Sequence, residues 1–324
     1  MKKIFLLGES MVELSRREDG AFNQSFAGDV YNTAVYLKRA FDDVSVSFVT
    51  ALGCDALSAD MLAAFESERI DTDFVQRSSD KLPGLYTISL DESGERSFAY
   101  WRSDSAARQV MQYVSSDLVD SLCTGDMFFF SGISLAVIQP NDRDAFWQLL
   151  RKLRDSGVQI AFDPNYRARM WSSGAEAKQQ FELAFGLADL VLPGVDDFNE
   201  LYGMNNVSDI RNFCRSFAID ELVLKSGSGS VYCFTDSDSL EVKITPVEHV
   251  VDTTSAGDSF NGVYLGARLQ GISIEQSVKL ASAAAAEVIQ HRGAIIPKAR
   301  FVNRIHPLIK QADPSPTSNK TTIE

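Results

Sequence analysis

Cysteine and histidine are scarce in this chain of 324 residues. The cysteines are Cys54, Cys123, Cys214 and Cys233, with no C-x-x-C pair, and the histidines are His249, His291 and His306. A zinc site needs such ligands at close spacing, so we expect no zinc or other transition-metal centre. Scattered thiols are typical of reduced cysteines in a cytoplasmic protein.

Positive charge is also in short supply. Lysine and arginine together number 31, against 44 aspartates and glutamates, which gives a net charge of −13. Binding along a phosphate backbone or at an anionic membrane depends on a basic surface. The composition therefore argues against nucleic acid and membranes as partners.

Long apolar runs are missing as well, although 45% of the residues are hydrophobic. No run approaches the roughly 20 residues that a membrane-spanning helix requires. The amino-terminal stretch MKKIFLLGES has a short apolar run, but Gly8 and Glu9 interrupt it before it reaches the length of a signal-peptide core. We interpret it as the first buried strand of a soluble globular protein with a substantial core.

Short apolar runs alternate with helical patterns along the chain. The apolar runs are bounded by glycine, proline or polar residues and predict buried strands at 3–8, 44–50, 126–132, 158–164, 188–194 and 221–227. Helical spacing occurs at 29–41, 141–157 and 207–220. This alternation predicts an α/β fold with a parallel sheet covered by helices, in which ligands bind at the carboxyl ends of the strands.

Two segments interrupt the alternation. Residues 11–29 and 84–104 have the pattern of β-hairpins, the second turning at Asp91 to Gly94. We predict one domain of residues 1–311, with a small β lid built from about 9–28 and 84–103. The polar stretch 312–324 is expected to be a disordered tail.

The stretch VDTTSAGDSF, residues 251–260, joins a run of small residues to the start of a helix. Such a turn presents the backbone N–H groups of Ala256, Gly257 and Asp258 at a helix N-terminus, where the helix dipole favours an anion. If that anion is a phosphoryl group in transfer, Asp258 is placed to accept a proton from the attacking hydroxyl. The pattern alone is equally compatible with an aspartate that caps a helix without any chemical role.

Further segments relate this stretch to a known family. It resembles the carboxyl-terminal signature of the ribokinase (PfkB) family of sugar kinases, and FAGDVYNTAVYLKRA, TALGCDALSADML and RGAIIP resemble other segments of that family in the same order. The resemblance covers nearly the whole chain. It implies a ribokinase-like three-layer α/β/α sandwich with a mostly parallel central sheet and a small β lid. It also implies Asp258 as catalytic base, with the backbone of Ser255, Ala256 and Gly257 as the anion hole.

Several positions depart from the family pattern. Ser255 and Ala27 stand where glycine is usual, and both are small enough to keep the backbone accessible. In LPGVDDFNELYG, Gly194 and Asp197 replace the asparagine and glutamate of an Asn-x-x-Glu motif that the family associates with magnesium and phosphate. Asp197 can still orient water bound to Mg²⁺, because this ion keeps several waters and needs only one or two carboxylates.

The nucleotide site is marked less sharply. LKSGSGSVYCF places Lys225, Gly227 and Gly229 at a strand end, but it is neither a Walker A loop nor a full G-x-G-x-x-G. From the residues alone it is a hairpin turn. In the family the equivalent region lines the ATP site, so the resemblance implies that these three residues bind ATP together with Asn165 and Gly257.

Two segments bear on the identity of the sugar. The lid stretch 82–108 supplies Tyr86, Tyr100 and Arg102, and FDPNYRARMW supplies Asn165 and Arg167. Guanidinium groups grip a carboxylate in bidentate fashion, which suits an acid sugar. Alternatively, both arginines lie on the surface or contact the phosphates of ATP.

Together these two segments resemble the members of the family that phosphorylate the 6-hydroxyl of 2-keto-3-deoxygluconate. The implied contacts of the sugar are Gly28, Asp29, Asn32, Tyr86, Tyr100, Arg102, Arg167 and Asp258. From the residues alone, Asp29 is also compatible with a helix cap. The galactonate form of the acid stays open.

Other properties also follow from the resemblance. The apolar lid residues Phe22, Phe26, Phe98 and Tyr100 could pack against a second lid, so we expect a homo-oligomer. The neighbourhood of Asp252, Thr254 and Ala294 matches the place where some relatives bind K⁺. Two other functions stay open: a fructokinase or ribokinase for a neutral sugar, and a catalytically silent sensor of sugar acids.

Overall fold

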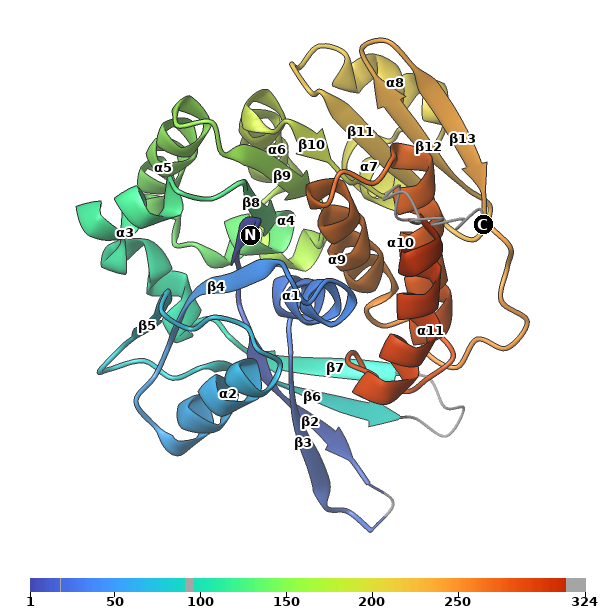
Figure 1. Ribbon diagram of the computed structural model, residues 1–324. Helices are drawn as coiled ribbons and strands as arrows, with labels where there is room; N and C mark the ends of the chain where they lie inside the picture. Colours follow the sequence, from blue (N-terminus) through green and yellow to red (C-terminus); the bar gives the residue numbers. More distant parts are fainter. Residues whose placement is uncertain (18, 91–95, 313–324) are drawn as a thin grey trace, which may run out of the picture.

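The computed structural model describes residues 1–17, 19–90 and 96–312. These residues form two sheets (Figure 1). In spatial order, the strands of the larger sheet are β13 (Ser239–Lys243), β12 (Ser230–Thr235), β11 (Glu221–Ser226), β10 (Leu190–Val191), β9 (Gln159–Asp163), β8 (Met127–Ser131), β1 (Lys3–Leu7), β4 (Ser45–Leu52) and β5 (Val75–Arg77). The smaller sheet has the order β3 (Phe22–Ala27), β2 (Met11–Arg16), β6 (Gly84–Leu90) and β7 (Arg96–Trp101).

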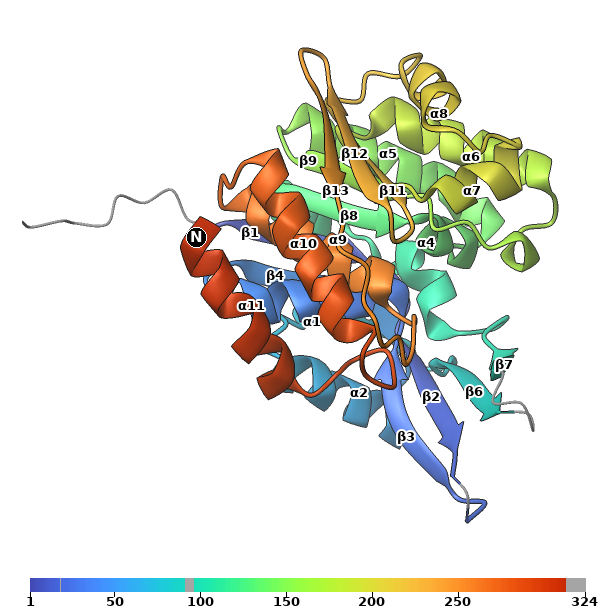
Figure 2. The same ribbon diagram turned by 90° about the vertical axis from the view of Figure 1, so that its right-hand side faces the viewer.

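Helices cover both faces of the larger sheet. They are α1 (Asp29–Ala40), α2 (Ala56–Ser67), α3 (Ser116–Leu122), α4 (Gly132–Val137), α5 (Arg143–Asp155), α6 (Gly174–Leu187), α7 (Val195–Tyr202), α8 (Val207–Cys214), α9 (Ala256–Leu269), α10 (Ile274–Val288) and α11 (Lys298–Ala312). Figure 2 shows α1, α9, α10 and α11 on one face, with α5 to α8 on the other. None of these helices combines the length and apolar character of a membrane span.

The sequence of β1 shows why the sheet has two cores. Ile4 and Leu6 belong to the cluster beneath α1 and α9, while Phe5 and Leu7 belong to the cluster beneath α5 and α6. Alternate side chains of a strand point to opposite faces, so a strand that is apolar at every position must be covered on both sides. The strands from β5 to β11 therefore form a parallel, doubly covered layer.

The predicted fold class, a three-layer α/β/α sandwich with a mostly parallel central sheet and a second small sheet, is confirmed. The hairpin turn inferred in LKSGSGSVYCF joins β11 to the antiparallel β12, whereas β13, which pairs antiparallel with β12, was not predicted. The predicted turn at Asp91 to Gly94 lies outside the described residues, as do residues 313–324 of the predicted tail, whereas Ala312 still belongs to α11.

Helices α1 and α9 approach each other unusually closely. A Cβ atom at Gly262 of α9 would lie 2.4 Å from the Thr33 carbonyl oxygen and 2.9 Å from the Leu37 nitrogen of α1. Only glycine permits this backbone contact. Because each helix carries predicted site residues in its first turn, the contact brings the two helix N-termini to the same place.

We predict that Gly262→Ala lowers the free energy of unfolding by about 2 kcal/mol, because the added methyl group forces α1 and α9 apart. Urea unfolding measures the loss. Gly186→Ala in α6 is the matched control, since a Cβ there meets no described atom within 4 Å and alanine favours a helix. Equal unfolding midpoints for Gly262→Ala and the wild type would refute the tight contact.

Candidate active site

A cavity of about 590 Å³ lies between the carboxyl ends of the parallel strands and the small sheet. It is large enough for a small ligand, within the range typical of binding sites. The predicted site residues that line it are Gly28, Asp29, Asn32, Tyr86, Tyr100, Arg102, Asn165, Arg167, Asp197, Lys225, Gly227, Ser255, Ala256, Gly257 and Asp258. Gly229 does not line this cavity.

Asp258 lies in the first turn of α9, beside α1. Its Oδ2 accepts a hydrogen bond of 2.9 Å from Nδ2 of Asn32, which is almost fully buried. Burial, and then the charge of Asp29, raise the pKa of Asp258 to about 7, and the bond from Asn32 offsets part of this rise. A carboxyl group with a pKa near neutrality can both accept and release a proton at the pH of a cell.

The turn before α9 has an uncommon backbone. Ser255 adopts φ 64°, the left-handed region that favours glycine. The N–H of Ala256 donates to the Thr253 carbonyl at 3.2 Å. Within the described part of the chain, the N–H groups of Gly257 and Asp258 have no such acceptor. A Cβ at Gly257 would meet no described atom within 4 Å, so a ligand can approach this backbone closely.

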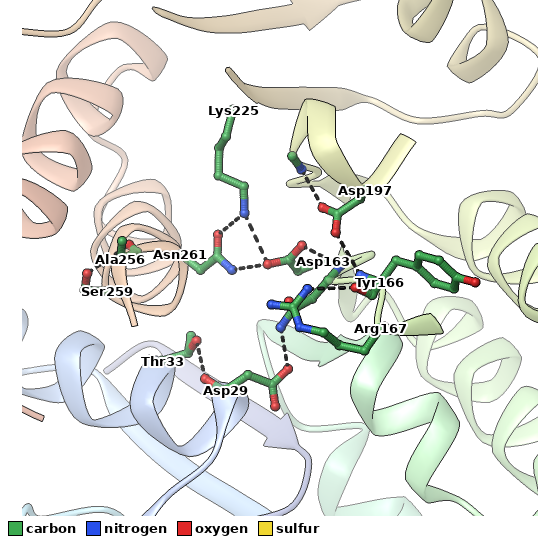
Figure 3. A network of polar contacts seen from close by, with 12 residues as sticks. Asp29, Thr33, Asp163, Tyr166, Arg167, Asp197, Lys225, Ala256, Ser259 and Asn261 are labelled. Carbon is green, nitrogen blue, oxygen red and sulfur yellow. Dashed lines mark hydrogen bonds and ion pairs between the residues drawn. The ribbon is translucent and has the colours of Figure 1, made fainter. Parts of the chain in front are cut away.

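A second group of charges lies across the cavity (Figure 3). Asp163, at the end of β9, accepts hydrogen bonds from Lys225 Nζ at 3.2 Å and from Asn261 Nδ2 at 2.5 Å. Asp197 accepts the backbone N–H groups of Tyr166 and Gly194, each at 2.8 Å. Burial, and then the charge of Asp163, raise the pKa of Asp197 to about 6, although Lys225 offsets this in part.

Aromatic rings of the small sheet form another wall. Tyr86 and Tyr100 stack with their ring centroids 5.5 Å apart. The Tyr86 hydroxyl donates to the buried Glu13, which also accepts from the Ser25 hydroxyl at 2.8 Å. Burial, and then the charge of Glu13, raise the pKa of the Tyr86 phenol, so this ring is neutral and fixed.

The segment after β9 supplies a cationic edge to the cavity. Asn165 has φ 33°, which asparagine tolerates better than most residues, and its amide donates to Asp29 Oδ2 at 3.0 Å. Arg167 Nη1 donates to the Tyr166 carbonyl at 2.7 Å. The guanidinium of Arg169 lies 4.3 Å from the centre of the Tyr100 ring, a cation–π contact that joins this segment to the small sheet.

The sequence analysis missed six polar residues in or beside the cavity. They are Glu9, Asp163, Arg169, Asp196, Thr253 and Asn261. Glu9 and Asp163 carried a usable signal, because each is an acidic residue at the carboxyl end of a buried strand. Asn261 lies one turn after Asp258 on the same helix face, a spacing that also could have indicated it.

The sequence and the fold both match known proteins. The model of the pfkB family carbohydrate kinases matches residues 1–300. The chain is 40% identical over 305 residues to a 2-dehydro-3-deoxygluconokinase of Escherichia coli K12, covering 92% of this chain and 98% of that protein. It is 40% identical over 304 residues to the protein of the same name from Dickeya dadantii, covering 91% and 97%.

A solved structure of an Escherichia coli protein in complex with ATP and Mg²⁺ superposes with a TM-score of 0.82 at 20% identity. The superposition covers 96% of this chain and 100% of that chain. At this identity the likeness concerns the fold alone.

The raised pKa of Asp258 predicts how stability depends on pH. An acid whose pKa rises on folding stabilises the folded state at low pH, and this contribution is lost as the pH rises through the folded-state pKa. Asp258→Asn avoids this loss because asparagine stays neutral. We therefore predict similar stabilities near pH 4 and a variant more stable by about 2 kcal/mol near pH 8, less than the full shift implies because Asp258 is only partly buried. Urea unfolding at both pH values measures this difference, and a pH-independent difference would contradict the assignment.

Proposed function

The chain belongs to the pfkB family of carbohydrate kinases, and we propose that it is a 2-dehydro-3-deoxygluconokinase. In this reaction the γ-phosphoryl group of ATP is transferred to the 6-hydroxyl of 2-keto-3-deoxy-D-gluconate. Two relatives at 40% identity over nearly the full length carry this name. The single observation that carries the mechanism is a carboxyl group of near-neutral pKa beside an open turn of backbone N–H groups.

Asp258 acts as the general base in this proposal. Its carboxylate accepts the proton of the 6-hydroxyl, so that the oxygen can attack the γ-phosphorus. Asn32 holds Oδ2 by its hydrogen bond, which leaves Oδ1 to face the sugar. Asp29, on the neighbouring turn of α1, contributes an acceptor for a sugar hydroxyl.

The Ser255–Gly257 turn stabilises the charge that develops during transfer. Gly257 and Asp258 supply the two backbone N–H groups that remain available, and the N-terminus of α9 adds partial positive charge. Lys225 contributes a cation on the opposite wall, already oriented by Asp163 and Asn261. These groups are fixed before the ligands bind, so they need little rearrangement during the reaction.

The sugar is held between the small sheet and the segment after β9. Tyr86 and Tyr100 cover the carbon chain, and Arg167, with its Nη2 and Nε donors left over from the bond to Tyr166, grips the carboxylate. Arg102 donates from the small sheet. Closure of the small sheet as a lid would exclude water and suppress hydrolysis of ATP.

The nucleotide extends from Lys225 and Gly227 toward a second pocket. This pocket, of about 500 Å³, is lined by Ile244, Ser282 and Ala283 among others. The N–H of Ile244 donates to the Gly229 carbonyl, so Gly229 lies between this pocket and the main cavity. The buried Ser282 hydroxyl has no hydrogen-bond partner among the described residues, which suits a polar ligand such as the nucleotide.

Magnesium would accompany the phosphates. Asp163 is buried and Asp197 is half-buried; desolvation and then the charge of Asp163 raise the pKa of Asp197, and a nearby divalent cation would offset this repulsion. Both Asp197 oxygens already accept backbone N–H groups, so Asp197 is suited to hold a water on Mg²⁺ rather than the ion itself. When bound, Mg²⁺ would neutralise charge on the phosphates. Gly194 has no side chain, so only its backbone could take part in this site.

A homo-oligomer that forms through the small sheet is also part of the proposal. Phe22 and Trp101 are more than half exposed, and Phe98 is 38% exposed. Phe26 is half-buried against the main core, so less of it is exposed to a second copy. A K⁺ site near Ala294 stays a prediction from the sequence.

The first test is release of ADP from ATP and Mg²⁺ with 2-keto-3-deoxygluconate, 2-keto-3-deoxygalactonate, fructose and ribose. We expect kcat to rise with pH and to level off above about pH 7, because Asp258 must be ionised to act as a base.

Asp258→Asn should lose about a thousandfold in kcat and still bind the sugar. Near-normal turnover of this variant would remove Asp258 from its role, and a preference for fructose or ribose would overturn the substrate.

Arg167→Ala tests the grip on the carboxylate. We predict that KM for the acid sugar rises about tenfold or more, the loss of one charge-assisted hydrogen bond, while KM for fructose changes about threefold or less. Initial rates with both sugars measure the difference. Equal losses for the two sugars would show that Arg167 does not recognise the carboxylate.

A further inference from the structure

Glu9 is a buried acid at the wall of the cavity. It lies two residues after the end of β1 and is only 2% exposed, yet it lines the space proposed for the sugar. Its backbone carbonyl packs against the start of α1, where a Cβ at Gly28 would lie 2.1 Å from the Glu9 oxygen. The backbone of Glu9 is therefore fixed by packing against α1.

The Glu9 carboxylate has two side-chain partners. Oε2 accepts from Nη2 of Arg102, and Oε1 accepts from the Ser105 hydroxyl. Gly84 leaves room for the carboxylate, since a Cβ there would lie 2.7 Å from Glu9 Oε1. A buried charge is tolerated only with such partners, so the ion pair fixes the guanidinium as well.

The guanidinium of Arg102 has other carboxylates within the cavity with which it could pair. Among the residues that line the cavity are five further carboxylates, those of Asp29, Asp163, Asp196, Asp197 and Asp258. The charge of Arg102 already reaches Asp29, whose pKa it lowers against the larger effect of burial. A guanidinium without Glu9 could swing onto Asp29 and block the place where sugar hydroxyls bind.

We propose that Glu9 is a positioning residue that sets the preference for an acid sugar. By holding Nη2 of Arg102, Glu9 keeps Nη1 directed across the cavity, where it lies 3.6 Å from the Met170 sulfur. Sulfur is a weak acceptor, so this amino group remains available to the carboxylate of the ligand. The inference rests on the proposed function, because it concerns how the acid sugar is recognised.

The test is Glu9→Gln, which keeps the shape of the side chain and removes its charge. We expect KM for 2-keto-3-deoxygluconate to rise about tenfold or more, with kcat changed about threefold or less, and KM for fructose nearly unchanged. Calorimetric titration of the acid sugar without ATP should show the same weakening. The double variant Glu9→Gln/Arg102→Gln should bind the acid sugar no more weakly than Arg102→Gln alone, because Glu9 acts through Arg102.

Two further variants separate positioning from a general effect on folding. Gly84→Ala keeps every charge, but its Cβ would lie 2.7 Å from Glu9 Oε1 and 3.2 Å from Arg102 Cβ, so it should disturb the pair and raise KM for the acid sugar. Glu221→Gln is the matched control: Glu221 is buried and paired with Arg268 at 2.8 Å, but does not line the cavity. It should lower stability and leave the ratio of the two sugars unchanged.

Four outcomes would overturn the inference. An unchanged ratio of acid to neutral sugar in Glu9→Gln would show a structural role only, and additive losses with Arg102→Gln would show that Glu9 acts elsewhere. A lower KM for the acid sugar would show that Glu9 competes for Arg102. A wild-type protein without a preference for the acid sugar would overturn the proposed function as well, which distinguishes the two failures.

Discussion

The contact between α1 and α9 at Gly262 determines where the chemistry can occur. It places two helix N-termini side by side, one carrying Asp29 and Asn32 and the other carrying Asp258. Helix dipoles favour carboxylates at these ends, yet burial raises the pKa values of both Asp29 and Asp258, and the charge of Asp29 adds to the rise at Asp258. A base of near-neutral pKa is thus a consequence of packing two helices without a side chain between them.

The remaining charges of the cavity are arranged around this pair. Lys225 is paired with Asp163 and Arg102 with Glu9, both through buried carboxylates. Such pairs contribute little to net stability, because desolvation offsets the attraction. These ion pairs instead orient the side chains: each cation points in one fixed direction before any ligand binds. Arg167 and Arg169, on the segment after β9, are instead exposed.

Local patterns allowed much of this structure to be predicted. The apolar runs correctly located β1, β4, β8, β9, β10 and β11, and the small residues before Asp258 indicated the turn. Partnerships between distant residues could not be predicted in this way. Asn261 and Asp163 are 98 residues apart and Arg102 and Glu9 are 93 apart, so only the fold reveals these pairs. The positive φ of Ser255 was also hidden, since serine gives no local sign of a left-handed backbone.

The distance between Asn32 and Asp258 also bears on the synthesis of the chain. These two residues are 226 positions apart, and α9 is among the last elements to leave the ribosome. The small sheet, too, joins β2 to β6 only after α1, β4 and α2 have been made. A chain that stops before α9 thus carries Asp29, Asn32 and the small sheet but lacks Asp258 and the turn at Ser255–Gly257. The proposed transfer becomes possible only once the segment that carries α9 has been made.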